Sequence, residues 1–188
     1  MKHWQLFVLL VGLPLLFDMV MVVLIILSII NKDTRSVFPI FPGIMLVVIF
    51  LCTGSFFAWL YTLGTSLYKK LPDNATMSLI TFKIFFFIPV LYILSLSAWI
   101  AVTFTHVSPE NPPSPLIFLL IIPLHLFSMF CIFYCLYFVA KTLKAVEWQK
   151  PVTFSDYIGE FFLLWFYFIG VWFIQPRINK LFAPAPET

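Results

Sequence analysis

The chain has 188 residues, of which 62% are apolar, 20% are aromatic and only 10% are charged. A soluble domain is roughly half apolar and a quarter charged, so this composition excludes a protein that covers itself with polar surface in water. The formal net charge of +3 is small, and the basic residues stand at the ends of apolar runs. This placement indicates contact with lipid headgroups and no nucleic-acid partner. We therefore expect an all-α, polytopic transmembrane protein whose main partner is the lipid bilayer.

The first two apolar segments are each long enough to cross ~30 Å of hydrocarbon. The first covers residues 4–30 behind Lys2, which resembles the start of a signal peptide, but the run continues without a small-residue cleavage pattern. We interpret it as a retained span. The second covers residues 43–68, begins after two prolines that fit a helix start, and ends at Lys69 and Lys70.

The third and fourth segments follow two contrasting connections. A short turn around Pro72 makes the second and third segments antiparallel neighbours. The third segment, residues 79–105, contains Pro89, which predicts a kink. Residues 106–115 hold four prolines and form a stiff link to the fourth segment, residues 116–140.

Residues 141–157 are polar, and they predict a helical continuation into the membrane interface that ends before Pro151. Ser155 and Asp156 can then cap a new helix. The last apolar run, residues 161–174, has only 14 residues. Re-entrant and interfacial segments compete with a true span at that length.

The distribution of basic residues favours four spans with both termini cytoplasmic. If the last run returns to its own side, the amino-terminal side holds eight basic residues and the other side holds two, Lys32 and Arg35. A fifth span changes this count to six against four, leaving out the embedded Lys83, and weakens the positive-inside pattern. Because the run is apolar on every face, we expect a re-entrant hairpin bent near Gly170, with five spans as the alternative. The eight basic residues are Lys2, Lys69, Lys70, Lys141, Lys144, Lys150, Arg177 and Lys180.

These segments divide the chain into three parts. Residues 1–140 form a four-helix transmembrane bundle, residues 141–182 an interfacial helix plus the re-entrant segment, and residues 183–188 a flexible tail.

The carboxyl-terminal region carries a family resemblance. The stretch VTFSDYIGEFFL at residues 152–163, continuing through Trp165 to QPRIN at residues 175–179, resembles the signature of a family of uncharacterised bacterial integral membrane proteins. The resemblance implies a bacterial inner membrane. It implies no activity and no catalytic residues.

Ionisable side chains inside apolar runs are the candidates for a site, because each costs at least ~2.5–3.5 kcal/mol in hydrocarbon and calls for a partner. Asp18 lies ~20 Å and His125 ~22 Å from the amino-terminal side of the membrane, so the two could meet at mid-depth. Such a pair could be a proton-binding site or ion relay. A structural hydrogen bond between helices, or a locally hydrated Asp18, explains the same residues.

A second pair, Lys83 and Glu160, predicts an ion pair that pins the last segment to the bundle, although Lys83 could also extend to the interface. Cys131 and Cys135 lie one turn apart and show no metal-ligand cluster, so we expect no metal and no cofactor. Gly54, with Ser55 and Ala58, forms a small-residue face that suits close helix packing.

These observations favour a non-enzymatic accessory or scaffolding subunit of a membrane complex, with a polar carboxyl-terminal surface that docks a protein partner on the cytoplasmic side. The alternative is a small proton- or ion-coupled transporter or channel that uses Asp18 and His125. No nucleophile elbow or phosphate-binding loop is present in the sequence, so an enzyme is the least supported class.

Overall fold

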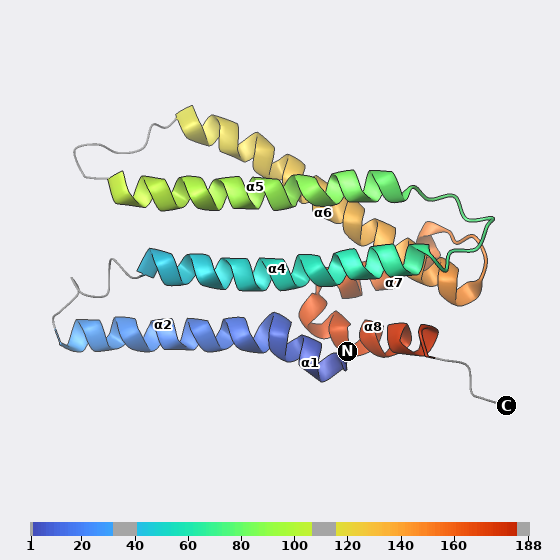
Figure 1. The fold of residues 1–188 in the computed structure, drawn as a ribbon, viewed down its shortest axis with the longest axis horizontal. Coiled ribbons are helices and arrows are strands. Elements are labelled where there is room, and N and C mark those ends of the chain that lie inside the picture. The colour runs from blue at the N-terminus through green and yellow to red at the C-terminus, as the bar shows by residue number, and fades with distance from the viewer. Residues whose placement is uncertain (1, 32–40, 107–115, 184–188) are drawn as a thin grey trace.

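The computed structural model describes residues 2–31, 41–106 and 116–183, and within these ranges every regular element is helical (Figure 1). Four helical segments are long and apolar enough to cross a membrane: Trp4–Ile30, Leu46–Tyr68, Leu79–Ile100 and Leu119–Trp148. The predicted fold class, a transmembrane bundle of four spans with a shorter carboxyl-terminal segment, is confirmed. In chain order the elements are α1 (His3–Phe7), the π-helical η1 (Val8–Gly12), α2 (Leu13–Ile30), α4 (Phe41–Tyr68), α5 (Leu79–His106), α6 (Leu116–Trp148), α7 (Phe154–Trp165) and α8 (Tyr167–Leu181).

The first span contains a π-helical turn before Pro14. The N–H of Leu13 donates to the carbonyl of Val8, five residues back, which widens the helix by one residue. Proline has no N–H and disturbs the preceding turn of a helix, so the wider turn accommodates it. In Figure 1, α1 is turned away from the axis of α2, and it packs against α8.

Helices α4, α5 and α6 pack around an aromatic core. The ring of Phe82 on α5 is fully buried and stacks on Phe138 of α6 with ring centroids 4.5 Å apart. The same ring fills the space beside Gly64 on α4, where an added Cβ would lie 2.4 Å from it. A glycine at this position therefore lets the three helices approach closely. Helix α5 passes through Pro89 as one continuous element.

Helix α6 continues past the hydrocarbon run to Trp148, and α7 and α8 then form a helical hairpin. Figure 1 shows α7 running back beside the bundle and α8 returning toward the end where α7 began. Thr153 and Asp156 begin α7, since the Asp156 carboxylate accepts hydrogen bonds from the N–H and the hydroxyl of Thr153, at 2.7 and 2.8 Å. The predicted caps, Ser155 and Asp156, thus lie inside the first turn.

The reversal occurs at Phe166, not near Gly170 as the sequence suggested. Phe166 has φ −88° and ψ 57°, outside the helical region, and its carbonyl accepts the N–H groups of Ile169 and Gly170 that begin α8. Because the chain turns back here, residues 161–174 do not form a fifth straight span.

Gly170 has a different role, as the point where α8 crosses α7. A Cβ at this residue would lie 1.7 Å from the carbonyl oxygen of Leu163, and that atom belongs to the backbone. The hairpin closes only because Gly170 has no side chain.

We expect Gly170→Ala to separate α7 from α8 and to lower the free energy of unfolding by about 1–3 kcal/mol, the usual cost of overpacking. Thermal unfolding in mild detergent measures the loss. The matched control is Gly159→Ala on α7, where a Cβ meets no atom within 4 Å and alanine improves helix propensity. Equal effects of the two substitutions would contradict the proposed role of Gly170.

Candidate functional site

Four charged side chains from three helices meet where the hairpin joins the bundle. Lys144 and Glu147 lie on α6, Glu160 on α7 and Arg177 on α8. Glu160 Oε1 accepts from Lys144 Nζ at 3.0 Å and from Arg177 Nη2 at 2.8 Å, and only 8% of its side chain is exposed. Arg177 also donates from Nε to Glu147 Oε1 at 2.6 Å and from Nη2 to Glu147 Oε2. We call these four residues the hairpin network.

The hairpin network keeps the carboxylate of Glu160 ionised. Burial alone raises the pKa of Glu160, but the hydrogen bonds from Arg177 and Lys144 outweigh it and hold the pKa below its ordinary value. The hydrogen bonds from Arg177 to Glu147 and Glu160 likewise raise the pKa of the guanidinium. With two positive and two negative groups, the network is balanced and its role is to hold helices together.

The predicted partner of Glu160, Lys83, is not part of this network. Lys83 is exposed on α5, and no ion pair joins it to Glu160 among the residues that the structure describes. Helix α7 packs mainly against α6 and α8. The lysine that pairs with Glu160 is therefore Lys144 of α6 and not the predicted Lys83 of α5.

Asp18 and His125, the predicted mid-membrane pair, lie on helices that do not pack together. His125 Nδ1 is 3.3 Å from the hydroxyl of Tyr92, which links α6 to α5. Asp18 is exposed on α2, and α2 packs against α4. The structure does not bring the two residues together.

Asp18 instead lies in an exposed stripe along α2. Its neighbours in this stripe are Leu15, Val22, Ile25 and Ile29, which are all exposed. Their spacing of three and four residues places all five on one side of the helix. Within the described residues, no side chain forms an ion pair or a hydrogen bond with Asp18. We call this set the α2 seam.

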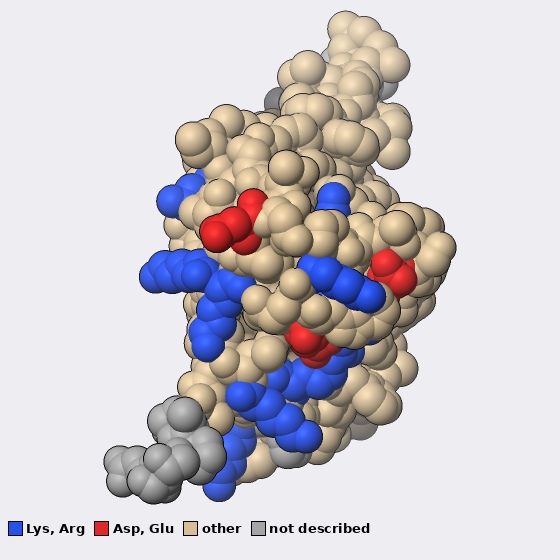
Figure 2. Space-filling model, turned by 90° about the vertical axis from the view of Figure 1, so that its right-hand side faces the viewer, with Lys and Arg blue, Asp and Glu red and all other residues tan. Residues whose placement is uncertain are grey.

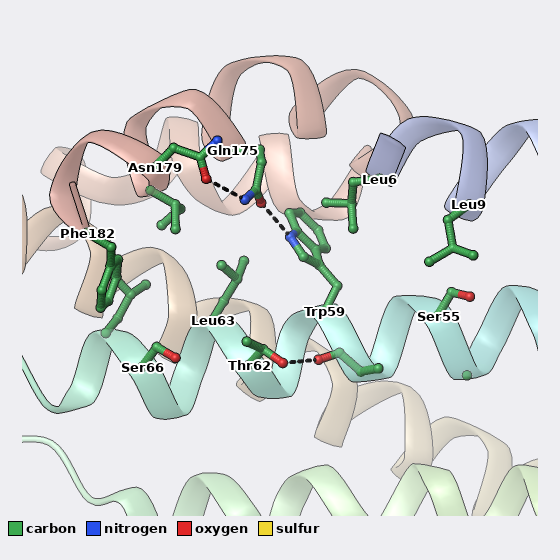
Figure 3. Close-up of a pocket in the computed structure, with 14 residues that line it drawn as sticks. Leu6, Leu9, Ser55, Trp59, Thr62, Leu63, Ser66, Gln175, Asn179 and Phe182 are labelled. Carbon is green, nitrogen blue, oxygen red and sulfur yellow. Dashed lines mark hydrogen bonds between the residues drawn. The ribbon is translucent and has the colours of Figure 1, made fainter. Parts of the chain in front are cut away.

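A groove of about 620 Å³ lies between α4 and α8, and sequence analysis did not predict it (Figure 3). Small residues of α4 form one wall, among them Ala58 and Ser66, and the amide side chains of Gln175 and Asn179 project from α8 on the other. Trp59 Nε1 donates to Gln175 Oε1 at 3.1 Å, and Gln175 Nε2 donates to Asn179 Oδ1 at 3.0 Å. Gln175 and Asn179, one helical turn apart just after the last apolar run, are the signal that could have indicated this wall.

In the part of the chain that the structure describes, no three His, Cys, Asp or Glu residues are grouped to hold a metal ion. Cys131 and Cys135 are buried in the packing of α6. Comparisons with family models, curated proteins and solved structures gave no match. The family resemblance of the carboxyl-terminal signature stays a prediction.

We expect Glu160→Gln to destabilise the hairpin by about 1.5–3 kcal/mol, the contribution of hydrogen bonds to a charged group. Because the pKa of Glu160 is lower in the folded protein than in the unfolded chain, near ~4.3, the stabilisation is present above that pH and is lost as the pH falls through the folded value. Melting temperatures of wild type and Glu160→Gln in detergent should therefore converge in acid.

The exposed turn carboxylate Asp73 supplies the control. Asp73→Asn should leave both the melting temperature and its acid dependence unchanged. A gap between wild type and Glu160→Gln that does not shrink as the pH falls below the unfolded value, near ~4.3, would contradict the ionised state assigned to Glu160.

Proposed function

We propose that this chain is a non-enzymatic accessory or scaffolding subunit of a membrane complex, and that the α2 seam binds a transmembrane helix of the partner. Asp18 is the observation that carries the proposal. It lies ~20 Å from either end of its span, and a carboxylate at that depth costs at least ~2.5–3.5 kcal/mol. A partner helix that supplies a basic or hydrogen-bonding side chain offsets this cost.

The packing of α2 supports the same function. Only Met21 and Ser28 of this helix are buried, and its outer face presents large aliphatic side chains. The three-and-four spacing of the α2 seam is the pattern by which helices pack along one another. Helix α2 thus has a surface that fits a second helix with one polar contact at its centre.

The charged end of the molecule supports a cytoplasmic location for the N-terminus and the end of α8. Figure 2 shows basic side chains gathered on the end where the N-terminus and α8 lie. By the positive-inside rule this end faces the cytoplasm, and the carboxyl-terminal signature favours a bacterial inner membrane. The basic end also offers a polar surface for a partner on that side.

The transporter alternative has less support from the geometry. It requires Asp18 and His125 to share a pathway, and they lie on helices that are not packed together, with His125 bonded to Tyr92. Asp18, exposed on α2 and without His125 as a partner, favours a contact between chains over an internal relay.

The test is purification from native membranes in mild detergent, with quantification of the proteins that remain bound. We expect wild type to retain a stoichiometric partner, Asp18→Asn to weaken retention about threefold, and Asp18→Leu to lose more, because interhelical polar contacts in bilayers contribute ~0.6 kcal/mol on average. Asp73→Asn is the control and should bind as wild type does.

Two results would count against the proposal. One is a wild-type chain that always purifies alone. The other is a proton flux in reconstituted vesicles that wild type supports and Asp18→Asn abolishes, because that result assigns Asp18 to transport.

A further inference from the structure

The groove between α4 and α8 runs along the direction of lipid acyl chains. Its α4 wall extends from Gly54 to Leu67, which is ~20 Å at the rise of an α-helix. Leu67 is near the end of α4 that carries Lys69 and Lys70, so the groove lies in the leaflet next to the basic end. Its length therefore matches most of one leaflet rather than a compact soluble ligand.

The groove is lined mainly by apolar side chains, with hydroxyl groups along its α4 wall and two amides on its α8 wall. Leu9, Gly54 and Ala58 line the inner part, and a Cβ placed on Gly54 would meet no atom within 4 Å. Ser66 and Asn179 line the part nearer the basic end (Figure 3). A ligand with a long apolar part matches this lining.

Basic side chains stand at one end of the groove. Lys70 Nζ donates to the carbonyl of Leu181 at 2.6 Å and lies 4.4 Å from the ring centroid of Phe182, which itself lines the groove. Lys69 and Lys180 are exposed on the adjoining ends of α4 and α8. Arg177, in contrast, is engaged by Glu147 and Glu160. The lysines provide positive charge at the depth of lipid headgroups.

The direct hydrogen bond from Trp59 to Gln175 joins α4 to α8 across the groove. This bridge hinders a helix, which is ~10 Å wide with its side chains, more than it hinders an extended acyl chain, which is much thinner.

We propose that this groove binds one acyl chain of an anionic phospholipid, with the headgroup against Lys70 and its neighbouring lysines. The site is separate from the α2 seam and does not depend on a protein partner. It gives the chain a preference for anionic lipid on the cytoplasmic side.

The experiment uses Trp59, which lines the groove, as a fluorescent probe. Purified full-length protein is titrated in detergent with phosphatidylglycerol or phosphatidylcholine brominated on the acyl chains, and the signal of Trp59→Phe is subtracted. We expect phosphatidylglycerol to quench Trp59 at lower lipid concentration. Native mass spectrometry of the retained phospholipid makes the same comparison without changing Trp59.

Two variants with matched controls test the two parts of the site. Lys70→Gln should reduce the preference for phosphatidylglycerol about fivefold, the effect of one basic side chain near an anionic surface, while Lys83→Gln on α5 leaves it unchanged. Ala58→Phe should fill the groove and reduce retention of both lipids. Val47→Phe, an exposed position of α4 outside the groove, should not.

Equal quenching and retention of the two lipids by wild type would overturn the headgroup assignment. Retention unaffected by Ala58→Phe would overturn the acyl-chain assignment. If Ala58→Phe instead released a bound protein while lipid binding stayed the same, the groove would be a helix-packing surface and the proposal would be wrong.

Discussion

The buried carboxylate of Glu160 holds the carboxyl-terminal hairpin in place, and much of the remaining architecture depends on it. Lys144 reaches it from α6 and Arg177 reaches it from α8, so one side chain ties three helices together. A charge this buried stabilises a fold only while its partners remain, because removing one leaves an uncompensated ion. The position of α8 against α1 follows from this connection, and so does the hydrogen bond from Trp59 of α4 to Gln175 of α8. The groove exists because α8 is held at that position.

The sequence was sufficient to predict the features that the bilayer itself dictates. Length and apolar composition determined the four spans, because a helix that crosses hydrocarbon needs about 20 apolar residues. The asymmetry of lysine and arginine predicted that the last run returns to its own side, which agrees with the hairpin. Both inferences rest on quantities counted along the sequence, namely segment length, apolar composition and the positions of basic residues. Neither needs knowledge of which helices are neighbours.

Pairing between helices was not predictable in this way. Asp18 and His125, and likewise Lys83 and Glu160, were paired because they lie at similar depths in the membrane. Depth does not say which helices pack together. The partners of Glu160 are residue 144, which precedes the hairpin, and residue 177, which lies in its second helix. The sequence did not indicate the bend at Phe166 either, because glycine is the usual signal for a turn. Gly170 instead allows the backbones of α7 and α8 to cross closely.

The hairpin network also imposes an order on biosynthesis. The lysine partner of Glu160 precedes it in the chain, but Arg177 is synthesised 17 residues later. Until Arg177 has left the ribosome, the carboxylate has only part of its final set of charges and burial of α7 remains unfavourable. We therefore expect α7 to take its final position only after α8 is made. The four spans precede the hairpin in the chain, so they are made before its charge network is complete.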